Sequence, residues 1–328
     1  MKLPKALIHV VLCLLGATSP ALQAAERAAT NDFPSKHIRW IVPFPPGGSN
    51  DVLGRYLAVK LTERLGHQVI IDNRGGANGI IGAELAARST ADGYTLLMIS
   101  TSFVMNAAVR PLPYDIEKSF DPISTIGSSP NAVVVDPTGG FNSLQDLVDR
   151  ARAKPASIFY ASTGIGGFNH FGGELFKKVA GVDMVMVPYK GGGPAMTDVM
   201  SGQIPVMFSS LTQVLPHIRS GRLKGLAIGA DKRSPVVPDI PTVAEAGFPG
   251  YEMAVWWGIA APAGAPQAVM EKLRGEITAV LQEPETKKRL AADSAEPMNL
   301  TQPEFRKMIN DDKKKWTDIA KQAGIRVQ

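Results

Sequence analysis

Short apolar runs and longer amphipathic segments alternate along the first hundred residues of the chain. An apolar run at 37–44 is followed by a segment whose leucines recur at every fourth residue over 53–65, the spacing of one helix face. Apolar runs at 69–72 and 94–100 predict two further strands, with a helix between them at 79–88. This β-α-β-α-β order predicts a parallel sheet with right-handed crossovers.

The same alternation continues through the rest of the chain, so the sequence predicts an α/β protein. We expect extended segments at 123–136, 157–161, 184–188, 206–209, 223–229 and 252–261. We expect helices at 143–153, 168–179, 194–201, 268–281, 283–292 and 302–322. Four prolines predict an irregular segment at 234–250.

The first 24 residues have the pattern of a secretory signal peptide. Lys2 and Lys5 precede an apolar run at 6–16, and small residues lead to a cleavage site that we expect after Ala24. The apolar run is too short to span a bilayer as a helix. The alternative is a buried N-terminal helix of the core. Removal of the signal leaves 304 residues with a net charge of +3 and without Cys13, the single cysteine.

The composition is that of a globular protein and excludes several kinds of site. Of the 328 residues, 45% are hydrophobic and 20% are charged, which allows a large core in one or two domains. A single cysteine excludes a disulfide framework and an iron–sulfur cluster. The formal net charge of +5 comes from scattered basic residues, and the lysine run at 313–315 adjoins two aspartates, so nucleic acid is not an expected partner.

Three glycine-rich turns each follow an expected strand and precede an expected helix. They lie at 46–50, 162–167 and 190–193. In parallel α/β sheets such turns gather beyond the carboxyl ends of the strands, where the N-termini of helices present free N–H groups. Together the turns predict a site for an anion such as a carboxylate, held without an arginine. The alternative is that the glycines only permit tight turns.

The sequence contains little that predicts catalysis. It has no nucleophile elbow, no phosphate-binding P-loop and no dinucleotide fingerprint. The histidines outside the signal segment, His37, His67, His170 and His217, have no metal-ligand spacing, so no metal or cofactor is expected. A hydrolase that uses Ser162 with His170 is an alternative, although no third member of a triad is evident.

Four positions have both a functional and a structural interpretation. His170 is either a base or ligand donor, or a helix-start histidine bonded to the neighbouring turn or to Glu174. Asp51 either contacts a ligand or stabilises the first turn of its helix through the dipole. Lys190 either attracts an anion or is solvated. The tryptophans at 256–257 either cover an organic ligand or place one ring in the core, since neighbouring strand residues face opposite sides.

Seven segments together resemble one known family. They are PFPPGGSND (43–51), NRGGANGIIGAE (73–84), DGYTLLM (92–98), YASTGIGGFNH (160–170), VPYKGGGPAMTDVMSGQIPVMF (187–208), PDIPTVAEAGFPGYE (238–252) and GIAAPAGAP (258–266). They occur in order over essentially the whole chain after the signal segment. In this combination the chain resembles the tripartite tricarboxylate transporter substrate-binding proteins, also called Bug receptors, of the bacterial periplasm.

The resemblance implies a type II periplasmic-binding-protein-like fold. In such a fold, two α/β domains joined by two crossover segments enclose a ligand cleft and close on the ligand about a hinge. Residues 1–24 would be the signal peptide, 25–126 and 253–328 a discontinuous domain 1, and 127–252 domain 2.

The resemblance also implies a set of ligand-binding residues, carried by the three turns and by the strand near 209. They are Phe44, Pro46, Gly47, Gly48, Ser49, Asp51, Ser162, Thr163, Gly164, Ile165, Gly166, His170, Tyr189, Lys190, Gly191, Gly192, Ala195 and Ser209. Many relatives carry an acid where Ser209 and Ser210 stand here. A ligand amine would therefore lose its partner, which favours a purely anionic or aromatic acid over an amino acid.

The function that the resemblance implies is capture of a small carboxylate for delivery to the subunits of a membrane permease driven by an ion gradient. Such carboxylates include di- and tricarboxylates and aromatic acids. The receptor would be a periplasmic monomer without a cofactor or enzymatic activity. An alternative with the same fold is a sensor that presents its ligand to a signalling kinase.

Overall fold

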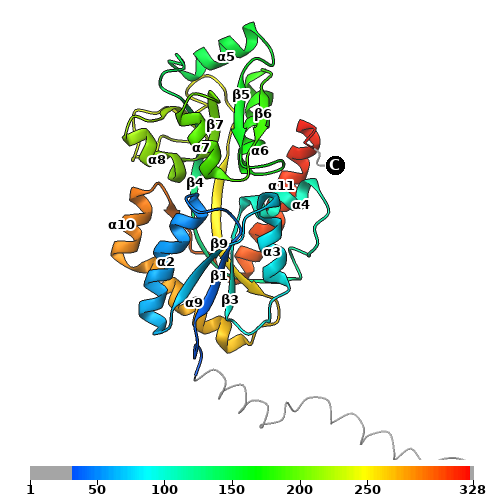
Figure 1. The fold of residues 1–328 in the computed structure, drawn as a ribbon, viewed down its shortest axis with the longest axis vertical. Coiled ribbons are helices and arrows are strands. Elements are labelled where there is room, and N and C mark those ends of the chain that lie inside the picture. The colour runs from blue at the N-terminus through cyan, green and yellow to red at the C-terminus, as the bar shows by residue number, and fades with distance from the viewer. Residues whose placement is uncertain (1–31, 326–328) are drawn as a thin grey trace, which may run out of the picture.

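Two groups of helices and strands lie one above the other in the computed structural model, which describes residues 32–325 (Figure 1). The expected signal peptide at 1–24 lies outside the described residues. Within the described part of the chain, no helix combines the length and the apolar character needed to cross a membrane. Strands and helices alternate, which confirms the predicted α/β class.

The first group begins with parallel strands and the helices between them. Its elements up to residue 109 are β1 (Ile38–Val42), α2 (Ser49–Leu65), β2 (Val69–Asn73), η1 (Ala77–Gly79), α3 (Ile80–Ala87), β3 (Thr95–Ser100) and α4 (Thr101–Val109). β1 pairs in parallel with both β2 and β3, as the sequence predicts. The regularly spaced leucines of α2 are buried on one face of that helix.

The second group repeats this arrangement. Its elements are α5 (Leu144–Ala153), β5 (Phe159–Ser162), α6 (Phe168–Ala180), β6 (Val185–Pro188), α7 (Gly192–Met200), β7 (Val206–Ser210), α8 (Leu211–Arg219) and β8 (Lys224–Ile228). β5 lies between β6 and β7 and is parallel to both. Apart from one isolated bridge at Thr242, residues 234–250 form no helix or strand, as their prolines predict.

Two long strands connect the groups (Figure 1). β4 (Phe120–Val135) pairs antiparallel with β9 (Ala254–Pro262) up to Pro130, and from Asn131 onward it pairs with β7 and β8 instead. The sheet order is therefore β2-β1-β3-β9-β4-β7-β5-β6. The domain boundaries expected after 126 and after 252 fall on or beside these strands, and they stay a prediction.

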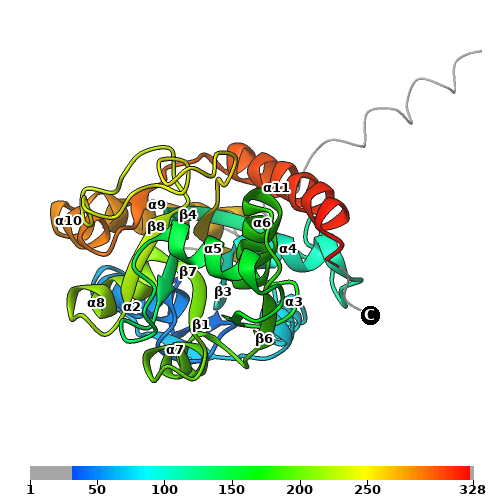
Figure 2. The same cartoon turned by 90° about the horizontal axis from the view of Figure 1, so that it is seen from above.

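The C-terminal helices pack against the first group, and the last of them reaches the second. They are α9 (Gln267–Gln282), α10 (Pro284–Ala292) and α11 (Gln302–Ala323), with β10 (Glu296–Pro297) paired to β4. Trp316 of α11 packs edge-on against Phe171 of α6, with ring centroids 5.4 Å apart. Figure 2 shows α11 beside both α4 and α6, so this helix joins the two groups along one side.

Two helices are missing from the sequence prediction, and both begin without a break after a strand. α4 starts at Thr101, directly after β3, and α8 starts at Leu211, directly after β7. Neither junction contains glycine or proline, the residues that predict a turn elsewhere in this chain. The available signal is a serine in extended conformation as the N-cap residue, Ser100 or Ser210.

A glycine allows α3 to lie directly on the backbone that follows β1. A Cβ atom at Gly82 would lie 2.6 Å from the carbonyl oxygen of Arg74 and 2.8 Å from Cα of Pro43. Both are backbone atoms, so a side chain at position 82 has to displace the helix. Because Pro43 leads into the first glycine-rich turn, this contact also positions that turn.

We expect Gly82→Ala to lower the free energy of unfolding by about 1–3 kcal/mol, because overpacking outweighs the gain in helix propensity. Gly275→Ala is the matched control. Gly275 is exposed in α9, and no atom lies within 4 Å of a Cβ added there. Alanine should therefore raise stability by about 0.5–1 kcal/mol. Urea denaturation measures both changes, and equal values would contradict the close packing at Gly82.

Candidate ligand-binding site

Two adjoining cavities lie where the two groups of elements meet. The inner cavity, about 40 Å³, is lined by Phe44, Pro45, Gly48, Ser49, Asn50, Ser100, Ser102, Thr163, Phe168, Asn169, Gly192, Ser209, Ser210, Gln213 and Val255. The outer cavity, about 760 Å³, is lined by Phe44, Pro45, Pro46, Asn73, Gly75, Gly76, Ala77, Asn78, Gly79, Arg110, Thr163, Gly164, Ile165, Tyr189, Lys190 and Gly191. A single water needs about 10–15 Å³, so the inner cavity has room for a group of carboxylate size.

Five helices begin at the wall of the inner cavity. Their N-cap residues are Gly48 of α2, Ser100 of α4, Gly167 of α6, Gly191 of α7 and Ser210 of α8. In each helix, the N-cap residue or a residue of the first turn lines this cavity. None of the five N-cap side chains accepts a hydrogen bond from its helix. The positive ends of five helix dipoles therefore meet at one cavity, together with first-turn N–H groups that have no cap from their own helix. Two of these amides, those of Phe168 and Thr212, donate instead to the hydroxyl groups of Ser102 and Ser129.

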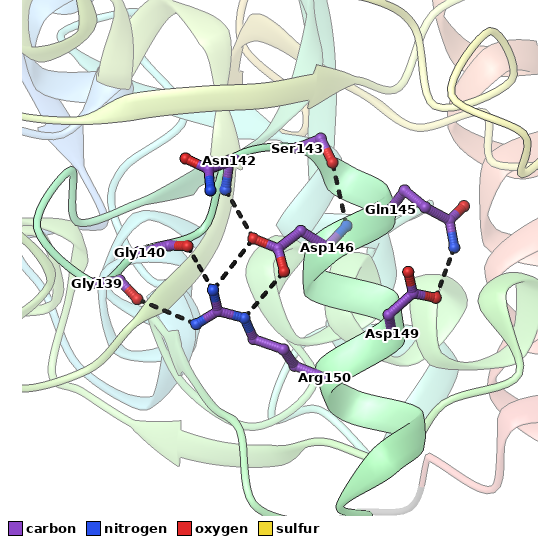
Figure 3. Close-up of polar contacts among 8 residues, drawn as sticks. All are labelled: Gly139, Gly140, Asn142, Ser143, Gln145, Asp146, Asp149 and Arg150. Carbon is purple, nitrogen blue, oxygen red and sulfur yellow. Dashed lines mark hydrogen bonds and ion pairs between the residues drawn. The ribbon is translucent and has the colours of Figure 1, made fainter.

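Two helices that begin elsewhere show the contrast. At α5 the Ser143 hydroxyl accepts from the Asp146 amide at 3.1 Å, and the Asp146 carboxylate accepts from the Asn142 amide at 2.9 Å (Figure 3). At α11 Thr301 and Glu304 form a capping box. These two helices supply acceptors from their own sequence. The five around the inner cavity do not, and neither do α3, α9 and α10, so the property that distinguishes the five is that they converge on one cavity.

The charges around the cavities have one sign. Among the described residues, no aspartate or glutamate lines either cavity, and the inner cavity has no charged side chain at all. The outer cavity contains two cations, Arg110 and Lys190. Within residues 32–325, no group of three or more histidine, cysteine, aspartate or glutamate side chains is arranged to hold a metal ion. The site therefore favours an anionic ligand and opposes an amine.

Asp51 supports the first turn from behind. Its buried carboxylate accepts hydrogen bonds from the Gly47 amide (3.0 Å), from Arg55 Nε (3.0 Å) and from Asn73 Nδ2 (2.9 Å). Burial by itself would raise the pKa of this carboxyl, but these hydrogen bonds and the charge of Arg55 hold it below its ordinary value of 3.8. Asp51 thus fixes Gly47, whose φ of +88° lies in the region that glycine tolerates.

His170 and Ser162 support the second turn in the same way. The buried imidazole Nδ1 of His170 accepts a hydrogen bond from the Gly166 amide at 3.0 Å, and the Ser162 hydroxyl donates to the Gly164 carbonyl at 2.9 Å. Burial lowers the pKa of His170 and so favours the neutral form that this hydrogen bond requires. In the described part of the chain, no hydrogen bond joins Ser162 to His170, so the geometry does not support a hydrolase.

Most of the predicted ligand-binding residues line a cavity. Those that do are Phe44, Pro46, Gly48, Ser49, Thr163, Gly164, Ile165, Tyr189, Lys190, Gly191, Gly192 and Ser209. Those that line neither cavity are Gly47, Asp51, Ser162, Gly166, His170 and Ala195. Trp256 and Trp257 are buried and also line neither, and Trp256 Nε1 donates to Asp312 Oδ2 at 2.6 Å. Contact of any of these residues with a ligand stays a prediction.

Several cavity residues are missing from the sequence prediction because they lie in, or directly before, the two unpredicted helices. Ser102 lies in α4 and Gln213 in α8, and the N-cap residues Ser100 and Ser210 are the last residues of β3 and β7. Arg110, which lines the outer cavity, immediately follows α4. A serine directly after a buried apolar run is the signal that identifies both helix starts, whereas no pattern distinguishes Arg110 from other arginines.

An α/β fold with a cleft of this kind defines the protein as a solute-binding protein of the periplasmic type. The family model described as the tripartite tricarboxylate transporter family receptor, TctC, matches residues 53–325. The chain belongs to this family, which is a family of substrate-binding receptors.

Relatives of known sequence and structure agree with this membership. Protein BugT of Bordetella pertussis is 34% identical over 321 residues, which are 97% of this chain and 98% of BugT. The structure of R. palustris Rpa4515 with adipate has a TM-score of 0.87 and 33% identity, covering 90% of this chain and 99% of that one. MatC from Rhodopseudomonas palustris with bound malate has a TM-score of 0.83 and 27% identity, covering 88% and 99%.

The neutral state of His170 makes stability depend on pH. Folding lowers the pKa of His170 from its ordinary value of 6.5. The stabilisation of the fold by neutral His170 is therefore complete above pH 6.5 and is lost as the pH falls towards the pKa of the folded state. We expect the free energy of unfolding to decrease from about pH 7 to about pH 5, and His170→Gln to reduce this decrease. Burial also lowers the pKa of His217, so His217→Gln measures a second contribution. Urea denaturation at each pH gives the slopes, and an unchanged slope in His170→Gln would contradict this role.

Proposed function

We propose that the protein is a periplasmic receptor that captures a small carboxylate in this cleft and delivers it to the membrane permease of a tripartite transporter. The observation that supports the proposal most strongly is that the N-termini of five helices meet at the inner cavity. None of these helices is capped by its own N-cap side chain, and no acidic residue lines the cavity. Residues 1–24 would act as the cleaved signal peptide that directs the chain to the periplasm.

A carboxylate matches the inner cavity better than a neutral or cationic group does. Each helix N-terminus acts as roughly half a positive charge, and its first-turn amides lack intrahelical acceptors. Ser49 and Ser100 line the same cavity, and their hydroxyl groups add donors, whereas the hydroxyl of Ser209 donates to Gln213 Oε1. An amine would find no acidic partner there, so its desolvation would not be offset.

Contacts across the cleft support capture by closure. The Phe168 amide at the start of α6 donates to Ser102 Oγ of α4 at 3.4 Å, and the Arg110 guanidinium donates to the Ile165 carbonyl. Each contact joins the first group of elements to the second. A ligand between the two domains expected from the sequence would add further contacts of this kind, and β4 and β9 would act as the hinge.

The similar proteins of known structure support the same class of ligand. Rpa4515 is solved with adipate and MatC with malate, and both ligands are small carboxylates. Both structures match this chain over nearly its whole described length. A receptor that works with a transporter is also the role that the family description states.

A thermal-shift screen of carboxylic acids, with sugars and amines as comparison ligands, tests the ligand class. A ligand at about 100 times its Kd adds about 2.7 kcal/mol to the free energy of unfolding, which is a measurable rise in Tm. We expect at least one small carboxylate to give such a rise. A rise with sugars or amines and with no carboxylate would contradict the proposal.

The sign of the charge in the inner cavity is tested at Ser209, which is buried and whose hydroxyl lies 3.2 Å from Gln213 Oε1. We expect Ser209→Asp to weaken carboxylate binding by about tenfold or more, because it places a negative charge beside the ligand anion. Ser209→Asn adds a side chain of nearly the same size without charge and is the matched control, expected to lose much less affinity. Calorimetry with the strongest carboxylate of the screen compares them. Equal affinities of the two variants would show that charge does not decide binding here.

A further inference from the structure

We infer that a cavity behind the ligand cleft sets how readily the cleft closes, and that the small side chain of Ala254 therefore limits the affinity for the ligand. The inference rests on the proposed function, although one of its two measurements needs no ligand. This back cavity has a volume of about 330 Å³. Its walls come from β10 and α11 on the side of the first group and from residues 228–234 of the second group.

The connection between the two groups is narrowest at four residues. Ser129 and Pro130 of β4 pair with Val255 and Ala254 of β9, and in the described structure no third strand pairs with these four. Towards the first group β10 and β3 join the sheet, and towards the second group β7 and β8 join it. A two-stranded ribbon twists more than a wider sheet does, so bending between the groups concentrates in this ribbon.

The two faces of the ribbon belong to different cavities. Val255 lines the inner cavity, whereas its neighbour Ala254 lines the back cavity. On the partner strand, the Ser129 hydroxyl accepts from the amide of Thr212 at the start of α8, and Pro130 lines the back cavity. Neighbouring residues of a strand face opposite sides, so the ligand cleft and the back cavity lie on opposite faces of one ribbon. Bending that narrows one of them widens the other.

Backbone hydrogen bonds hold the ribbon to the second group. The Asn131 amide donates to the Met253 carbonyl at 2.7 Å, the Met253 amide to the Gly229 carbonyl at 3.1 Å, and the Gly229 amide to the Asn131 carbonyl at 2.8 Å. These three bonds form a closed ring where β8 ends and β9 begins. Because Ala254 directly follows Met253, its position is fixed relative to the second group.

The charged walls of the back cavity allow its width to change at little cost. Glu296 and Lys315 line it on the side of the first group, and Asp231 and Lys232 line it in the second group. All four are exposed, so they keep their water when the cavity widens, and pairs among them gain little when it narrows. The volume of the side chains on the ribbon then limits how far the cavity narrows, and Ala254 leaves most of that space open.

A larger side chain at position 254 occupies space that has to narrow when the cleft opens. The open form then becomes less stable relative to the closed form, in which both groups contact the ligand. The apparent Kd equals the intrinsic Kd divided by the fraction of protein that is competent to bind, so a larger closed fraction lowers the apparent Kd.

The experiment compares Ala254→Trp with wild-type protein by calorimetry, with the strongest carboxylate of the thermal-shift screen, and by small-angle X-ray scattering without ligand. Ala254→Ser keeps the small volume at the same position. Ala292→Trp adds the same ring at an exposed position at the end of α10 that lines none of the three cavities. We expect Ala254→Trp to lower the Kd at least about threefold and the controls to stay within about twofold of wild type. The radius of gyration should be smaller in Ala254→Trp alone.

A lower Kd separates this role from a merely structural one, because damage to the ribbon would weaken binding. A Kd of Ala254→Trp that equals or exceeds the wild-type value, or an unchanged radius of gyration, would contradict the inference. The contact of Trp316 with Phe171 would then hold the two groups in one arrangement. If Ala254→Trp does not fold, Ala254→Leu replaces it, with a smaller change in the same direction. If wild-type protein binds no carboxylate, the proposed function fails, whereas the radius of gyration still decides the inference.

Discussion

The N-termini of five helices without side-chain caps of their own are the constraint on which the proposed site depends. Buried backbone donors are costly to leave unsatisfied, and the five helices around the inner cavity have no side-chain cap of their own. A bound carboxylate accepts about four hydrogen bonds, so it would satisfy some of the remaining first-turn amides, and the dipoles of all five helices would favour its charge. The proposed anion site would thus work without a charged residue in the inner cavity. Side-chain caps like that of Ser143 at α5 would satisfy the helices and remove the reason for a ligand to bind (Figure 3).

The charged and titratable residues near this cavity act on its backbone. Asp51 holds the amide of Gly47, and His170 holds the amide of Gly166, so each of two ligand turns has one buried side chain behind it. The sheet then brings the turns together, because β4 pairs with β9 of the first group and with β7 and β8 of the second. The proposed ligand site is therefore assembled from both groups of elements, and ligand binding there would depend on how the groups are placed relative to one another.

The sequence predicts most of the fold because strand and helix periods alternate clearly and glycine or proline marks most junctions. The sequence does not predict α4 and α8 because these helices follow their strands directly. Three of the five serines that line the inner cavity, Ser100, Ser102 and Ser210, are missed with them. The roles of Asp51 and His170 could not be decided from the chain alone. An aspartate or a histidine at such a position suits a ligand contact and a helix start equally well. Only the folded positions of hydrogen-bond partners, such as Asn73 beside Asp51, decide between these two roles. The sequence has no pattern that marks Arg110, because only the folded structure places it in the lining of the outer cavity.

The most direct measurement is a crystal structure of the protein with its tightest-binding small carboxylate. One carboxylate should lie in the inner cavity, with its oxygens at hydrogen-bond distance from first-turn amides of helices from both groups, such as those of α2 and α7. No charged side chain should contact that carboxylate. A ligand with no carboxylate in the inner cavity, or with its carboxylate held there mainly by side-chain cations, would contradict the claim that helix N-termini bind the anion.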